Sequence, residues 1–150
     1  MSKFLRTVLL LIGFALCAQT ANAHTYLVRF GPAGVGMGGT NPLGIPPTIA
    51  DVELSMHSKS DFEYNVAITW LTFGHRFYKT KDFYLSAGAG LILSLSGLTP
   101  GVYTAVGSDI RLGKRSVLNF EYKQGLGIGG SPLTLISPYA IRIGYGLCFK

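Results

Sequence analysis

The feature that most constrains this chain is a period-two alternation of side chains, repeated in long runs along most of the sequence. From Phe83 to Leu95 every second residue is apolar, and the residues between them are mostly small or polar. From Tyr139 to Phe149 every second position is bulky, and the intervening positions are mostly small. Successive side chains of a β-strand point to opposite faces, and we find no convincing helical period. The pattern therefore predicts an all-β fold.

Clear runs of this kind number seven, which is an awkward count for a closed sheet. They span residues 25–30, 51–57, 64–70, 83–95, 102–112, 118–123 and 139–149. Single-chain bacterial barrels have even strand numbers. We therefore expect eight antiparallel strands, with the eighth taken from the Gly-rich stretch 33–39 or from Leu126 to Ile136.

Length and composition indicate which solvent the apolar faces meet. The three longest runs, of 11 to 13 residues, match the ~9–11 tilted residues that cross a bilayer and exceed the ~5–6 of a typical soluble strand. Hydrophobic residues make up 48% of the chain and charged residues only 13%, about half the ~25% usual in soluble domains. Aromatic residues cluster near the ends of runs, as in interfacial girdles: Phe62, Tyr64, Phe77, Tyr78, Phe83, Tyr84 and Tyr139. These features predict a transmembrane β-barrel; the alternative is a soluble barrel that holds an apolar ligand.

The first 23 residues have the features of an export signal. Lys3 and Arg6 precede the apolar run Val8 to Ala18, and Ala21-Asn22-Ala23 is a small-x-small cleavage pattern. The run is about half the ~20 residues of a transmembrane helix, and Leu16 before Cys17 disfavours a lipoprotein signal. We expect a cleaved signal at 1–23 and one domain at 24–150. Its single cysteine, Cys148, excludes a disulfide framework.

With its signal, alternating strands and aromatic-rich last run, the chain resembles the small outer-membrane β-barrel proteins of Gram-negative bacteria. The resemblance implies location in the cell outer membrane. It also implies contact with outer-membrane lipids and lipopolysaccharide, and with the barrel-assembly machinery during insertion. That machinery commonly recognises an aromatic end of the last strand, which here corresponds to Tyr145, Leu147 and Phe149, although Lys150 follows them. No nucleic-acid partner is expected of an exported chain.

Charged residues on the polar faces predict a network inside the lumen. They are Glu53, Asp109, Arg111, Glu121, Lys123 and Arg142. Opposite charges in a narrow lumen should pair, because an isolated buried charge is costly. About eight strands enclose a space that side chains just fill. We therefore expect a filled lumen and a structural or interaction role; a narrow polar path or ligand site is the alternative.

Two glycine-rich stretches match the pattern of a dinucleotide-binding turn. They are Gly34–Gly39 and Gly125–Gly130. Such a turn must open a helix, and the prolines that follow both stretches prevent one. We interpret both stretches as loops and expect no nucleotide or other cofactor.

An enzymatic role is a weaker hypothesis. Some outer-membrane barrels hydrolyse lipid A or phospholipid with His and Ser, and this chain offers His57 near Ser55, Ser58 and Asp61, and separately His75. A serine nucleophile needs a base within hydrogen-bond reach and a group that orients the base. Adjacent side chains of a strand end diverge, so we expect polar strand-end residues and no enzyme. No histidine spacing predicts a metal site.

Two further expectations concern the turns and the faces. Five basic residues lie in predicted turns and are interpreted as solvated, with phosphates of lipopolysaccharide or phospholipid as alternative partners: Lys59, Lys79, Lys81, Lys114 and Arg115. Replacing lipid-facing Ile143 with Arg should cost about 2–4 kcal/mol. Gly144→Ser, on the lumen face, should be mild.

Overall fold

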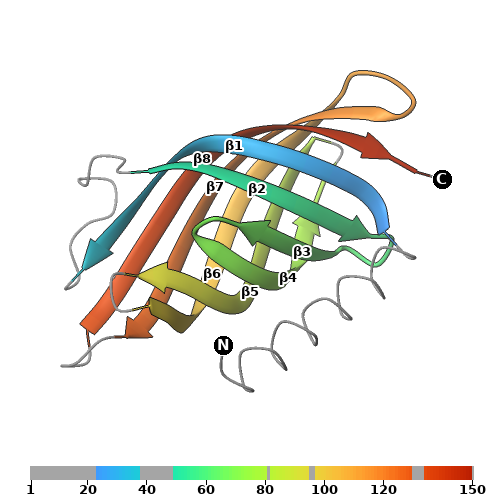
Figure 1. The fold of residues 1–150 in the computed structure, drawn as a ribbon. Coiled ribbons are helices and arrows are strands. Elements are labelled where there is room, and N and C mark those ends of the chain that lie inside the picture. The colour runs from blue at the N-terminus through green and yellow to red at the C-terminus, as the bar shows by residue number, and fades with distance from the viewer. Residues whose placement is uncertain (1–22, 38–48, 81, 95–96, 130–133, 150) are drawn as a thin grey trace, which may run out of the picture.

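The computed structural model describes residues 23–37, 49–80, 82–94, 97–129 and 134–149, which form a closed barrel (Figure 1). Every strand pairs antiparallel with its neighbours in sequence, and β1 pairs with β8 to close the sheet. The strands are β1 Ala23–Met37, β2 Ile49–Ser58, β3 Phe62–Ala67, β4 Trp70–Lys79, β5 Phe83–Ser94, β6 Gly97–Arg111, β7 Ser116–Gly129 and β8 Thr134–Cys148. The predictions of an all-β fold and of eight antiparallel strands are confirmed.

The eighth strand lies in a place that the sequence does not indicate. Alternation predicts one strand over 64–70, but that strand ends at Ala67, and a new strand, β4, starts at Trp70 after Ile68 and Thr69. The predicted sources of the extra strand are wrong, because 33–37 belongs to β1 and 126–136 contributes to β7 and β8. Trp70 consequently points into the barrel and is 2% exposed.

The glycine-rich stretches are strand where they are described, so their interpretation as loops is wrong there. Gly34 lies within β1 and Gly125 within β7, whereas residues 38, 39 and 130 lie outside the described residues. A Cβ on Gly125 would lie 2.7 Å from the Trp70 ring. The missing side chain therefore leaves room for a tryptophan in the lumen.

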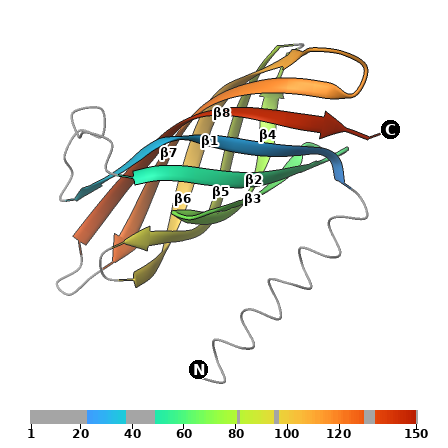
Figure 2. The same ribbon diagram turned by 45° about the horizontal axis from the view of Figure 1, so that its top comes forward.

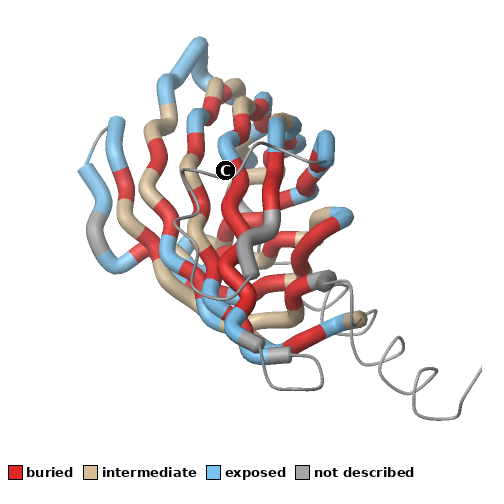
Figure 3. Tube along the Cα trace, turned by 90° about the vertical axis from the view of Figure 1, so that its left-hand side faces the viewer, coloured by how far each residue is buried: buried red, intermediate tan, exposed pale blue. Residues whose placement is uncertain are grey.

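Burial alternates along the strands as the sequence pattern requires (Figure 3). On β1, Leu27 and Arg29 are fully buried, whereas Val28 and Phe30 are 53% and 60% exposed. One face of each strand thus lines the lumen, and the other, apolar face forms the outer wall. Two predicted girdle residues are exceptions: Tyr84 points into the lumen and is 1% exposed, and Tyr139 is buried at 5% exposure.

The barrel has two unlike ends. The start of β1 and the end of β8 lie at the same end, which we call the terminal end (Figure 2). The turns β2–β3, β4–β5 and β6–β7 lie there too, and Asp61 in the first of them has a positive φ of 61°. The opposite, distal end holds the β3–β4 connection and the ends of β1, β5 and β7.

Of the predicted signal at 1–23, only Ala23 is described, as the first residue of β1. Within the described ranges, no helix is long and apolar enough to cross a bilayer.

Candidate functional site: a charged network in the lumen

The centre of the lumen is organised around Arg29 on β1. Its Nη1 lies 2.7 Å from Glu53 Oε1 and 3.2 Å from Glu121 Oε2. Its Nε donates to Asn119 Oδ1 at 2.7 Å, and its Nη2 donates to the hydroxyl of Tyr84 at 3.3 Å. All five side chains are buried. The planar guanidinium therefore uses its fixed set of donors to tie four strands together.

Glu53 connects this centre to a second group of charges. Its Oε2 lies 3.1 Å from Lys123 Nζ and 3.2 Å from Arg142 Nη1. Arg142 also pairs with Asp51, whose carboxylate accepts a hydrogen bond from Thr69 at 2.8 Å. Glu53 is therefore in contact with three cations, Arg29, Lys123 and Arg142. The contacts through Arg142 and Asp51 extend the network toward the distal end.

A third group lies toward the terminal end and is centred on Arg76. Its Nη1 lies 2.6 Å from Asp109 Oδ2, and its Nε lies 3.2 Å from Glu63 Oε2. The other oxygen of Glu63 accepts from the hydroxyl of Tyr103 at 2.7 Å. The guanidinium carbon of Arg76 lies 3.5 Å from the centre of the Tyr84 ring. Tyr84 therefore joins the groups, because its hydroxyl also bonds to the central network.

The buried charges of the described lumen balance. The buried cations are Arg29, Arg76, Lys123 and Arg142, and the buried carboxylates are Asp51, Glu53, Glu63 and Glu121. Each of these charges has an oppositely charged partner within 4 Å. A neutral, internally paired set avoids the large cost of burying unpaired charges.

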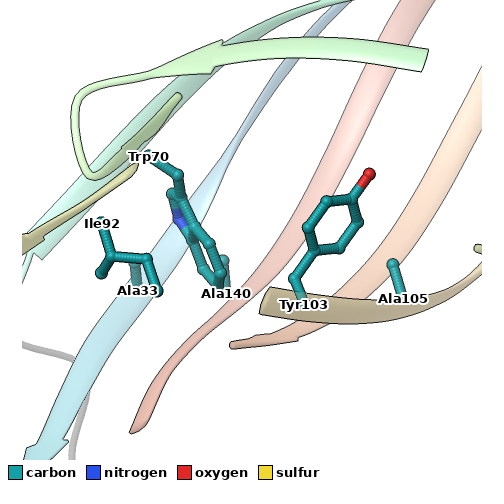
Figure 4. Packing of buried hydrophobic residues seen from close by; sticks show 6 residues of the cluster. All are labelled: Ala33, Trp70, Ile92, Tyr103, Ala105 and Ala140. Carbon is teal, nitrogen blue, oxygen red and sulfur yellow. The ribbon is translucent and has the colours of Figure 1, made fainter. Parts of the chain in front are cut away.

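An apolar layer lies at the distal side of the network (Figure 4). Trp70 and Ile92 are direct cross-strand neighbours and are 2% and 1% exposed. They pack with Ala33 and Ala140, from the seam between β1 and β8. Apolar side chains therefore fill the lumen between the charged centre and the distal end.

The terminal side is more open. A cavity of about 100 Å³ lies at this mouth. Among the residues that line it are His57, Arg76, Tyr84, Asp109, Arg111 and Cys148. The lumen thus has a polar mouth at one end and an apolar closure at the other.

The six charged residues predicted for the lumen do not all lie in one place. Glu53, Glu121, Lys123 and Arg142 are buried in the network described above. Asp109 is partly buried and accepts from Arg76 and from Asn119. Arg111 is exposed at the mouth and has no ion pair with any described residue. The residues suggested as an assembly signal lie on the outer face at the terminal end of β8, where Tyr145, Leu147 and Phe149 are 52%, 46% and 50% exposed.

Sequence reasoning misses half of the buried charges. Arg29, Asp51, Glu63 and Arg76 are absent from the predicted lumen set, although all are buried there. For Arg29 a usable signal exists, because it alternates with the apolar residues Val28 and Phe30. Arg76 lies in β4, which the alternation pattern does not distinguish from β3. No face can therefore be assigned to Arg76 from the sequence.

The histidine and serine considered as hydrolase residues are part of the lumen network. Ser55 Oγ lies 2.9 Å from His57 Nε2 and donates to Asn65 Oδ1 at 2.5 Å. Arg76, which can only donate, lies 3.2 Å from the same histidine nitrogen. The nearest carboxylate oxygen, from Glu63, also faces Nε2, at 3.8 Å. A triad needs the carboxylate on the other ring nitrogen, so this geometry favours structural hydrogen bonding over nucleophile activation.

The other residues of that hypothesis have separate local roles. Ser58 Oγ accepts from the backbone N–H groups of Ser60 and Phe62, both at 3.2 Å, and so shapes the turn. Asp61 pairs with Lys79 at 2.6 Å. His75 lies against the Phe62 ring with centroids 4.9 Å apart. His57, Ser58 and Asp61 all line the cavity at the terminal mouth, whereas His75 does not. None of the contacts of Ser58, Asp61 and His75 given above joins them to His57 or to one another.

A polar patch interrupts the outer wall between β7 and β8. The register passes from the pair Gln124–Tyr139 to the pair Gly127–Ile136, next to Pro138, which has no N–H to donate. The Gln124 amide donates to Ser137 Oγ at 2.9 Å and to the Pro138 carbonyl at 3.0 Å. Gln124 therefore supplies hydrogen bonds where the ladder is interrupted.

No family model matches the chain, and no curated protein matches it. Within the described residues, no group of three or more His, Cys, Asp or Glu side chains is placed to hold a metal ion.

Proposed function

We propose that this protein is an integral β-barrel of a bacterial outer membrane, with a salt-bridged, filled lumen and a structural or interaction role. The observation that carries the proposal is the orientation of the two faces. The ion pairs between fully buried side chains lie inside, and large apolar side chains are exposed outside. Exposed examples from several strands are Phe30, Val52, Phe73, Val102, Leu126 and Ile141, each between 46% and 60% exposed.

Closure of the sheet supports the same proposal. In hydrocarbon every backbone polar group needs a partner within the protein, and only helices and closed barrels meet this requirement. Here β1 pairs with both β2 and β8, so the sheet has no free edge. The interruption beside Pro138 is bonded by a side chain instead.

Aromatic side chains at the terminal end fit a membrane interface. Phe62, Phe77 and Phe83 are 39%, 62% and 40% exposed there. Phe149 packs edge-on against Tyr26, with ring centroids 5.6 Å apart. Aromatic girdles of this kind flank the apolar band of membrane barrels.

A soluble barrel that holds an apolar ligand requires the reverse arrangement. Its apolar face would line the interior and its charges would face water. In this barrel the interior is occupied by paired charges and by Trp70, so an apolar ligand would have to displace both.

The proposal is tested by refolding the protein from urea into phospholipid vesicles. Membrane barrels commonly migrate differently on gels before and after boiling, and we expect this heat-dependent shift only when vesicles or detergent are present. Recovery of a folded, monodisperse protein from detergent-free buffer would contradict the proposal and favour the soluble alternative.

A further inference from the structure

Exposed basic residues gather at the terminal end of the barrel. Lys59 lies in the β2–β3 turn and Lys79 ends β4, while Arg111, Lys114 and Arg115 lie at the β6–β7 turn. All five are exposed, and we call them the basic rim. They are distributed over three turns that follow one another around the mouth, so they surround it instead of forming one lateral patch.

The distal end differs sharply in charge. The sequence between the strands whose ends meet there contains no Lys, Arg, Asp or Glu, over residues 38–48, 68–69, 95–96 and 130–133. Described residues next to these connections are apolar and exposed, with Ile68, Leu98 and Ile128 between 57% and 61% exposed. Among the residues that the structure describes, the exposed charged side chains therefore lie at the terminal end, and the side chains exposed at the distal end are largely apolar.

Acidic residues do not neutralise the basic rim. Asp61 pairs with Lys79, but the other four basic residues have no ion pair with any residue that the structure describes. Asp82, in the β4–β5 turn, is also exposed. Its single negative charge offsets only part of the positive charge of the four unpaired basic residues. The rim therefore has an excess of positive charge beside the exposed aromatic residues of the terminal end.

We propose that the basic rim binds the phosphates of anionic glycerophospholipids in the leaflet at the terminal end, and so sets the orientation and depth of the barrel. A ring of separate cations matches a flat layer of headgroup phosphates around the barrel better than it matches one compact ligand. Basic residues next to a membrane gain attraction from anionic lipid, and this attraction is screened by salt. The inference rests on the proposed function, because it requires a barrel in a bilayer.

The test compares the wild-type chain with Lys59→Gln/Lys114→Gln/Arg115→Gln. Their folding equilibria are measured by urea titration in phosphatidylcholine vesicles, with and without about one third phosphatidylglycerol. We expect the neutralised variant to lose roughly a hundredfold in its folding equilibrium constant in anionic vesicles at low salt, since each of the three basic residues contributes about fivefold. In phosphatidylcholine vesicles, and at high salt, the two chains should agree.

Two controls separate charge from side-chain structure. Lys59→Arg/Lys114→Arg/Arg115→Lys keeps the charge and should behave as the wild type, whereas Asp82→Asn should strengthen the preference for anionic lipid. Equal folding of the neutralised and wild-type chains in anionic vesicles would overturn the rim proposal alone, as would the same loss in both lipids. Failure of the wild-type chain to enter either vesicle would overturn the proposed function and the rim proposal with it.

Discussion

Arg29 on β1 and Glu53 on β2 lie directly opposite each other across an antiparallel pair, and their fully buried side chains form an ion pair of 2.7 Å. Glu53 has further contacts with Lys123 and Arg142. A carboxylate among three cations, out of contact with water, holds together strands from both sides of the β1–β8 closure. The lumen network therefore links strands across the barrel as well as filling its interior.

Removing the charge of Glu53 should strongly destabilise the barrel. Glu53→Gln leaves three buried cations short of one carboxylate, and breaking a buried pair in this way typically costs about 3–5 kcal/mol. Urea unfolding in vesicles, followed by the fluorescence of Trp70, measures the change. In phosphatidylcholine vesicles, which offer the basic rim no anionic lipid, Asp82→Asn removes an exposed carboxylate and should change the free energy of unfolding by less than about 0.5 kcal/mol. Similar effects of the two substitutions would contradict the network.

A charged side chain on the outer face should destabilise the barrel. Ile141 lies at the middle of β8 and is 50% exposed, so on the lipid interpretation Ile141→Arg should cost about 2–4 kcal/mol. Ile141→Leu, the matched control, keeps the apolar volume and should be close to neutral. The same urea titration in vesicles measures both, and a tolerated arginine would indicate that this face meets water.

Gly144 should be intolerant of a side chain, contrary to the mild effect expected from the sequence. A Cβ there would lie 2.5 Å from Arg29 Cγ and 2.9 Å from the Val28 carbonyl oxygen. Gly144→Ser should therefore displace Arg29 and cost about 1–3 kcal/mol. Gly113→Ser is the control, because the nearest atom to a Cβ at that turn position is 3.6 Å away. Equal unfolding midpoints for the two variants would count against the packing around Arg29.

Gln124 should stabilise the interrupted part of the wall. Gln124→Leu removes the donors to Ser137 and Pro138, and leaving buried acceptors unpaired costs about 1–3 kcal/mol. Thr104→Val changes a polar side chain on the paired position of β6 and should have a smaller effect. Hydrogen exchange of the β7 and β8 amides gives a second readout, and it should become faster near Gly125 only in Gln124→Leu.

The sequence is sufficient for the face of most long runs, because alternation is unambiguous where large apolar residues repeat. This is why alternation alone assigns Glu53, Glu121, Lys123 and Arg142 to the lumen. Alternation does not show where β3 ends and β4 begins. Ile68 and Thr69 form the connection without Gly, Pro, Asn or Asp, so no usual turn signal separates the two strands.

The details of the network lie beyond the sequence for a different reason. Partners such as Arg76 and Glu63 are fixed by the strand register, and shifting the register by one residue reverses every face. Extending the alternation of β6 to its end predicts a lumen position for Arg111, but the barrel mouth is already open there. Alternation gives the direction of a side chain and does not tell where along the strand the lumen ends.

The most direct test of the proposed outer-membrane location is cell fractionation after expression of the full chain in a Gram-negative bacterium. This location predicts that the protein is recovered with the outer membrane, resists extraction by alkaline carbonate, and shows a heat-dependent shift on gels. Recovery in the soluble periplasmic fraction, with a folded barrel that needs no detergent, would contradict it.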